Sequence, residues 1–222
     1  MSTAEIIPDQ LPIWARKHAA GEHELTRGNH SMLAEQLVSN LPKHATVLEL
    51  GCGAGGDAGY FAEQGLTVLA TDFSETIINK NKEFFSHQSL RFETVDMQQP
   101  LPYRNDTFEA VYAYLSLHYY TDELTFKIFA EINRVLKPNG LLAFSCKSND
   151  SVRMENATIV AEDVYVDKKG HALHVFTTTY VRGLTGGLFS VVMLEEKVQD
   201  YLGRNSTQVN FIGKRLVRMA TI

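Results

Sequence analysis

The chain has 222 residues, of which 44% are hydrophobic and 21% are charged, close to globular averages, so a disordered chain and a fibrous protein are both excluded. Acidic residues exceed basic ones, 26 against 21, and the net charge of −5 gives no overall attraction to nucleic acid or anionic lipid. Two cysteines cannot supply a disulfide framework or a cysteine-based zinc site. Because no apolar run reaches the roughly 18 residues of a membrane span, we expect a cytoplasmic protein.

Residues 1–44 are predicted to form an N-terminal arm followed by a helical cap. The first twenty residues look like an arm. Apolar residues recur at helical spacing over residues 24–40, which predicts a helix that stops at Pro42. Trp14 in the arm either closes a pocket or docks on the surface, and the sequence does not decide between the two.

Residues 45–222 are predicted to form one core domain in which strands and helices alternate. The predicted elements are a strand over 45–50, a helix over 57–64, a strand over 66–70, a helix over 75–86, strands over 91–95 and 108–112, a helix over 122–136 and a strand over 141–145. Strands that are separated by such helices need crossover connections, so the sheet should be mostly parallel, with helices on both faces.

The last third of the chain changes character. Residues 149–175 are polar, and we interpret them as an insertion or lid that faces the substrate, with disorder as the alternative. A short helix is predicted over 178–184, followed by long strands over 188–199 and 208–216. No helix of crossover length lies between these two strands, so we expect an antiparallel pair that closes the sheet.

A glycine loop follows the first predicted strand and indicates a ligand site. Gly51, Gly53 and Gly56 have the spacing of a dinucleotide fingerprint, and Asp72 lies where an acid that holds ribose hydroxyls belongs. Glu49 favours a different ligand, because a carboxylate at the end of a buried strand needs a cationic or donor-rich partner. A pyrophosphate would not supply that partner.

Several motifs carry a family resemblance. The segment VLELGCGAG at residues 47–55 resembles the first motif of class I S-adenosylmethionine-dependent methyltransferases. Residues 71–73 and 95–97 resemble the second and third motifs, and residues 108–111 and 138–140 are similar to the start of the fourth and fifth strands of that family. The small-molecule, single-domain bacterial enzymes, including the tellurite-resistance type, are the most similar in layout.

The resemblance implies a Rossmann-like α/β fold, a doubly wound, seven-stranded, mostly parallel sheet with an antiparallel closing strand. It also implies S-adenosylmethionine as cofactor, S-adenosylhomocysteine as product, and no metal. Glu49 would act near the amino group of the methionine part, Asp72 at the ribose, Asp96 at the adenine amine, and Met97 against the adenine ring. The predicted cofactor-binding residues are Glu49, Gly51, Cys52, Gly53, Gly55, Asp72, Phe73, Asp96, Met97, Tyr114 and Arg27.

Three of the predicted site residues have a structural alternative. Arg27 could receive the methionine carboxylate or be an exposed helical arginine. Tyr114 could face the sulfonium with its ring, as a catalytic and cofactor-binding residue, or be a core aromatic. His118 could act as the catalytic base for the acceptor, or simply pack near the following helix.

The acceptor is expected to be a small molecule. The fourth strand lacks the Asp/Asn-Pro-Pro-Tyr tetrad of amino methyltransferases that act on nucleobases or protein glutamine, so nucleic acid is not an expected partner. The acidic net charge and the lack of a long apolar run make a membrane partner unexpected as well. His171 and His174 have no third ligand at suitable spacing, and no metal is expected there. An NAD(P)-linked oxidoreductase and a non-catalytic module that binds an adenosyl ligand remain the alternatives, and the oligomeric state stays open.

Overall fold

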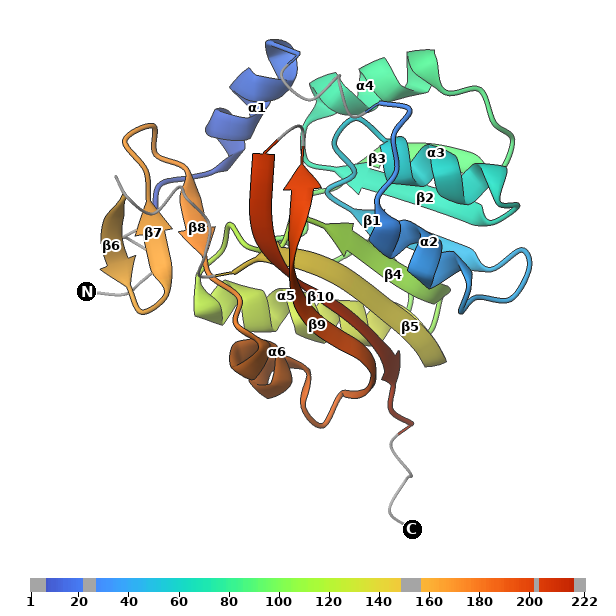
Figure 1. Cartoon of the computed structure of the whole chain (residues 1–222). Helices are drawn as coiled ribbons and strands as arrows, with labels where there is room; N and C mark the ends of the chain where they lie inside the picture. The colour runs from blue at the N-terminus through green and yellow to red at the C-terminus, as the bar shows by residue number, and fades with distance from the viewer. Residues whose placement is uncertain (1–6, 22–26, 149–156, 202–203, 218–222) are drawn as a thin grey trace.

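The computed structural model describes residues 7–21, 27–148, 157–201 and 204–217. Its main sheet has seven strands in the order β3-β2-β1-β4-β5-β10-β9 (Figure 1). These strands are β1 (Thr46–Leu50), β2 (Thr67–Asp72), β3 (Leu90–Thr94), β4 (Phe108–Tyr114), β5 (Leu136–Lys147), β9 (Phe189–Tyr201) and β10 (Arg204–Arg215). Strands β1 to β5 are parallel, whereas β10 is antiparallel to both β5 and β9. The predicted sheet and its antiparallel closing pair are confirmed.

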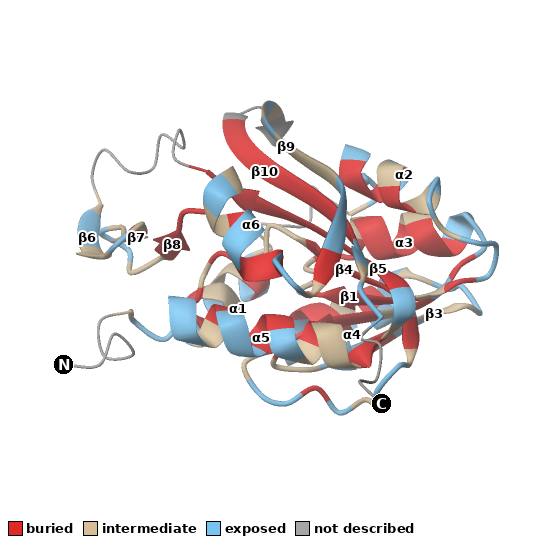
Figure 2. Cartoon of the chain, turned by 90° about the horizontal axis from the view of Figure 1, so that it is seen from below, coloured by how far each residue is buried: buried red, intermediate tan, exposed pale blue. Residues whose placement is uncertain are grey.

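Helices cover both faces of this sheet. The helices on one face are α2 (Met32–Val38), α3 (Gly56–Glu63) and α4 (Glu75–Phe84), and those on the other are α5 (Asp122–Val135) and α6 (Thr178–Thr185). Strand β1 shows why, because Val47 packs into the core under α2, α3 and α4 whereas Leu48 packs into the core under α5 and α6. Figure 2 shows the central strands buried along most of their length and the edge strand β9 largely intermediate or exposed.

The N-terminal segment differs from its prediction. Residues 11–19, expected to be an arm, form helix α1 (Leu11–Ala19), with a proline in the first turn where its missing N–H costs nothing. The helix predicted over 24–40 is reduced to α2, because Ser31 caps that helix by accepting the N–H of Ala34 at 3.1 Å. Residues 24–26 of that prediction lie outside the described residues.

The described part of the predicted lid is ordered. Strands β6 (Thr158–Ala161), β7 (Val164–Val166) and β8 (Ala172–His174) form a separate antiparallel sheet, whereas residues 149–156 lie outside the description. Gln10 joins this sheet to α1, since its side-chain amide donates to Gly170 O at 3.0 Å and accepts the N–H of Ala172 at 2.9 Å. The arm and the insertion, which are far apart in sequence, therefore meet (Figure 1). Within the described ranges, no helix is long and apolar enough to cross a membrane.

Candidate active site

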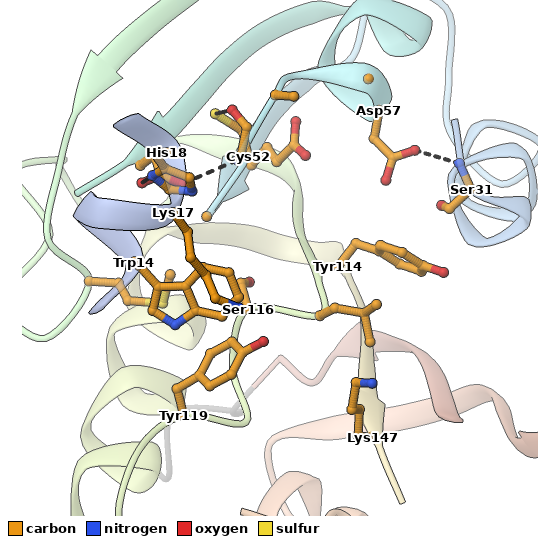
Figure 3. A pocket seen from close by; sticks show the side chains of 18 of the residues that line it. Trp14, Lys17, His18, Ser31, Cys52, Asp57, Tyr114, Ser116, Tyr119 and Lys147 are labelled. Carbon is orange, nitrogen blue, oxygen red and sulfur yellow. Dashed lines mark hydrogen bonds and ion pairs between the residues drawn. The ribbon is translucent and has the colours of Figure 1, made fainter. Parts of the chain in front are cut away.

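A cavity of about 740 Å³ opens at the carboxyl ends of β1, β2, β4 and β5 (Figure 3). This is the edge at which open α/β sheets bind their ligands, because the crossover loops leave a crevice there. Most of the predicted cofactor residues line this cavity. They are Glu49, Gly51, Cys52, Gly53, Asp72, Phe73, Met97 and Tyr114.

The glycine loop after β1 is held rigidly against its neighbours. Gly51 has φ +72°, and a Cβ there would lie 2.5 Å from Cβ of Ser116, whose hydroxyl donates to Leu50 O at 2.7 Å. A Cβ on Gly53, by contrast, would meet nothing within 4 Å, so the backbone at this point faces open space. The loop therefore presents bare backbone to the cavity.

Gly55 has a different role from its neighbours. It does not line the cavity but is the N-cap of α3, with φ +79°, and a Cβ there would lie 2.9 Å from the ring of Phe85. The prediction that Gly55 binds cofactor finds no support in this placement. Its side-chain-free backbone is needed for helix packing.

Glu49 is the most unusual acid of the site. It is 3% exposed, and its Oε2 has no hydrogen-bond partner among the described residues. Burial raises the pKa of Glu49 well above its ordinary value, and the nearby carboxylates of Asp57 and Asp72 raise it further. Such a carboxylate is suited to a bound cation that also donates hydrogen bonds.

Asp72 closes the end of β2 against the glycine loop. Its two oxygens accept the N–H of Gly53 at 3.1 Å and the N–H of Ser74 at 3.0 Å. Burial raises its pKa to about 6, so the carboxylate is charged at neutral pH. His18 of α1 lies 4.0 Å away, and its pKa is lowered to about 4, by burial first and then by Lys17 and Lys80. The imidazole beside Asp72 is therefore neutral.

Asp57, in the first turn of α3, was not predicted as a site residue. Its carboxylate accepts the N–H of Ser31 at 2.6 Å and the hydroxyl of Tyr112 at 2.7 Å, and burial raises its pKa. The Ser31 and Tyr112 hydroxyls are themselves 2.7 Å apart. This triad fixes the segment before α2 against the cavity (Figure 3). The sequence signal that could have found it is an acid in the first turn after a glycine loop.

Aromatic side chains form the wall opposite Asp57 (Figure 3). The Trp14 ring lies 4.9 Å from that of Tyr119, edge to face, and the ammonium of Lys17 lies 4.6 Å from the Trp14 ring centre. Both rings line the cavity. The structure thus decides between the two roles left open for Trp14, since its ring forms part of the wall.

Tyr114 lies at the end of β4 and lines the cavity as predicted. Its hydroxyl lies 3.4 Å from Oε1 of Gln199 and 3.3 Å from Oε1 of Gln208. A purely apolar core position is therefore ruled out for this tyrosine.

Besides Gly55, three predicted residues do not line the cavity. The Arg27 guanidinium donates to Oδ1 of Asn81 at 3.3 Å and lies over the Phe84 ring, and Asp96 uses its carboxylate to accept the N–H of Gln98 at 2.9 Å. His118 is fully buried and packs on the Tyr119 ring, with 4.3 Å between ring centres. It borders only a separate space of about 20 Å³, so the predicted base is not placed to reach an acceptor in the main cavity.

We therefore expect His118→Ala to act on stability and leave ligand binding intact. Loss of a fully buried ring should lower the free energy of unfolding by about 2–4 kcal/mol. Urea denaturation measures this loss, and calorimetry with S-adenosylhomocysteine should give a dissociation constant within two-fold of the native one. A native-like unfolding free energy would contradict the structural role.

Several lining residues were not predicted because they come from segments distant in sequence. They include His18 of α1, Ser31, Lys147 at the end of β5, and Lys197 and Gln199 of β9. No local pattern marks the lysines and Gln199, because only the pairing of β5, β10 and β9 brings them to the cavity. Among the residues that the structure describes, no group of three His, Cys, Asp or Glu is placed to hold a metal ion.

Comparison with known proteins agrees with this geometry. Residues 47–140 match the family model described as a methyltransferase domain. The chain is 31% identical over 150 residues to phosphoethanolamine N-methyltransferase 1 of Triticum aestivum, which covers 64% of this chain and 30% of that protein. It is 29% identical over 140 residues to malonyl-[acyl-carrier protein] O-methyltransferase of Enterobacter lignolyticus, covering 62% of this chain and 52% of that protein. The chain thus spans between about a third and a half of the length of these curated relatives.

A solved structure shows the same fold. The 1,6-didemethyltoxoflavin-N1-methyltransferase of Burkholderia thailandensis, with bound 1,6-didemethyltoxoflavin and S-adenosylhomocysteine, superposes with a TM-score of 0.73 at 18% identity. The match covers 93% of this chain and 87% of the other. At this identity, the likeness concerns the fold alone.

Proposed function

We infer that the chain belongs to the class I S-adenosylmethionine-dependent methyltransferases, and on this premise we propose that it transfers the methyl group of S-adenosylmethionine to a small-molecule acceptor. The observation that carries the proposal is Glu49, a buried carboxylate with an oxygen that no described residue satisfies, beside a glycine loop. An amino group on the ligand would supply the missing cationic donor.

The other lining residues also fit this cofactor. Asp72 would accept the ribose hydroxyls, the bare backbone at Gly53 leaves room for the ligand's close approach, and Phe73 and Met97 would pack against the adenine. A dinucleotide fits less well, because Glu49 would repel a pyrophosphate. We therefore favour the methyltransferase over the NAD(P)-linked oxidoreductase.

The chemistry asks little of the protein beyond alignment. When bound, S-adenosylmethionine supplies an already activated methyl group on a sulfonium, so a general base is not obligatory. Trp14, Tyr119 and Met97 would exclude water from the cavity, and the Tyr114 ring and hydroxyl would orient the acceptor beside the methyl group. This role for Tyr114 distinguishes a catalyst from a module that only binds the cofactor.

A small acceptor fits the size of the cavity. Its volume of about 740 Å³ lies within the range of small-molecule sites, roughly 300–1,000 Å³. The relatives' names point the same way, since phosphoethanolamine and 1,6-didemethyltoxoflavin are small molecules. We propose a compact acceptor that enters beside the wall formed by Trp14 and Tyr119.

Thermal unfolding with separate ligands tests the cofactor assignment. S-adenosylmethionine or S-adenosylhomocysteine at 100 times its dissociation constant should stabilise the protein by about 2.7 kcal/mol, which raises the unfolding midpoint by about 5–11 °C. NAD and NADP should leave the midpoint unchanged. A shift with a dinucleotide alone would overturn the proposal, and transfer of a labelled methyl group to an acceptor would complete it.

A further inference from the structure

The sheet face that continues the cavity beyond Tyr114 is polar. Strand register places Lys147 of β5 opposite Gln208 of β10, and Gln208 opposite Lys197 of β9. Directly paired residues point to the same face of a sheet, so these three side chains form one row across three strands. Both lysines line the cavity.

A second polar row lies next to the first. Tyr114 of β4 pairs with Ser145 of β5, which pairs with Asn210 of β10. The hydroxyl of Ser145 donates to Oε1 of Gln208 at 2.9 Å, and the Tyr114 hydroxyl lies 3.3 Å from the same oxygen. Gln208 and Ser145 are fully buried. Nearer the start of β5, the same face of the sheet carries the apolar residues Leu141 and Ala143. Burial of this polar floor, formed by Tyr114, Ser145, Lys147 and Gln208, costs free energy, which hydrogen bonds to a bound ligand can offset.

Two carboxamides at this floor have donors that no described residue satisfies. The buried side-chain Nε2 atoms of Gln208 and Gln199 have no hydrogen-bond partner among the described residues. Lys147 is only 9% exposed, donates to Oγ of Ser206 at 3.4 Å, and projects from β5 toward Tyr114 (Figure 3). Lys147 and the carboxamide of Gln199 thus line one end of the cavity, and Gln208 lies fully buried between the two lysines in the sheet.

Apart from Lys17, whose ammonium lies over the Trp14 ring on α1, the charges of the cavity are segregated. The carboxylates of Glu49, Asp57 and Asp72 lie at the glycine-loop end, whereas Lys147 and Lys197 lie on the β5 and β9 side. Lys197 is partly exposed and pairs with Glu195 at 3.1 Å, whereas Lys147 is buried. The two ends therefore favour ligand groups of opposite charge.

We propose that the methyl acceptor carries an anionic group, a carboxylate or a phosphate, which Lys147 binds together with the carboxamide of Gln199. This inference rests on the proposed methyl transfer, because it assigns the acceptor end of the same cavity. An anion anchored there directs the rest of the acceptor past Tyr114 toward the glycine loop. The flat walls formed by Trp14 and Tyr119 contact the apolar part of the acceptor.

Matched probe pairs test the proposal on the full chain saturated with S-adenosylhomocysteine, and again without it. Isothermal titration compares benzoate with benzamide for the carboxylate, and phosphoethanolamine with ethanolamine for the phosphate. In at least one pair, the anionic member should bind at least ten-fold more tightly than the neutral or cationic member. Lys147→Met should reduce this preference below two-fold, and Lys147→Arg should retain most of it.

Lys214→Met is the matched control, since Lys214 is an exposed lysine near the other end of β10. It should keep the native preference, and all three variants should bind S-adenosylhomocysteine within two-fold of the native affinity. The proposal is overturned if neither pair shows a preference for the anion in the native protein, or if Lys147→Met retains it. Failure of S-adenosylhomocysteine to bind the native protein would instead refute the proposed function, so the two failures are distinguishable.

Discussion

Glu49→Gln is expected to stabilise the ligand-free protein while removing most of its affinity for S-adenosylmethionine. The native carboxylate is buried with an oxygen that no described residue satisfies, and desolvation together with Asp57 and Asp72 disfavours its charge. A neutral amide avoids that charge, so the free energy of unfolding near pH 7.5 should rise by about 1–3 kcal/mol. Loss of a buried charge-assisted contact to the ligand's amino group should weaken binding by about 100-fold or more.

The pH dependence of the free energy of unfolding tests the same prediction independently. The pKa of Glu49 is raised in the folded protein, so between its ordinary value and the raised one the folded state holds a proton that the unfolded state has released. The free energy of unfolding of the native protein should therefore fall as pH rises through this window. Urea denaturation at pH 5 to 8 should show a weaker fall in the Glu49→Gln variant.

Glu109→Gln is the matched control because its carboxylate has the opposite environment. Hydrogen bonds from Lys137 and Thr46, together with the ion pair to Lys137, outweigh the desolvation of Glu109 and lower its pKa to about 2. Its substitution should destabilise the protein modestly, with the loss seen above the ordinary glutamate pKa, and should leave cofactor affinity intact. If both glutamine variants destabilise the protein and bind S-adenosylmethionine normally, Glu49 has no role in the site.

Asp72→Ala is expected to raise the dissociation constant of S-adenosylhomocysteine by about 100-fold, whereas Asp96→Ala should raise it ten-fold at most. Asp72 lines the cavity at the end of β2, and in the proposed binding mode its carboxylate would accept two ribose hydroxyls, each such charge-assisted hydrogen bond contributing about 1.5–3 kcal/mol. Asp96 does not line the cavity and accepts the N–H of Gln98, so at most one weaker contact depends on it.

Isothermal titration of both variants with S-adenosylhomocysteine measures the difference directly. Circular dichroism must show native secondary structure, because Asp72 also accepts the N–H groups of Gly53 and Ser74, and its loss loosens the glycine loop. Asp72→Asn separates the two effects, since it retains an acceptor oxygen for the loop without the charge. Equal losses in Asp72→Ala and Asp96→Ala would show that the ribose has been placed wrongly.

Much of the donor end of the site could be predicted from the sequence by itself. Hydrophobic runs, glycines and helix periodicity are local signals, and they give the order of strands and helices from β1 to α5. The carboxyl ends of parallel strands share one edge of a sheet, so the chain positions of Glu49, Asp72 and Met97 were sufficient to bring them together. The glycine loop and its acids therefore indicated the adenosyl ligand before any contact was known.

The residues of the proposed acceptor end come together only in the tertiary structure. Lys147 reaches Gln208 and Lys197 only because β5, β10 and β9 pair in one register, and a shift of one residue would turn a strand's side chains to the opposite face. The Trp14 ring forms part of the cavity wall because α1 packs over a cavity that residues far along the chain also line. The placement of His118 likewise depends on a distant segment, since its carbonyl accepts the N–H of His174 in β8 and its side chain borders a space separate from the main cavity. Periodicity and turn chemistry act over a few residues, whereas register and packing between distant segments emerge only when the chain folds.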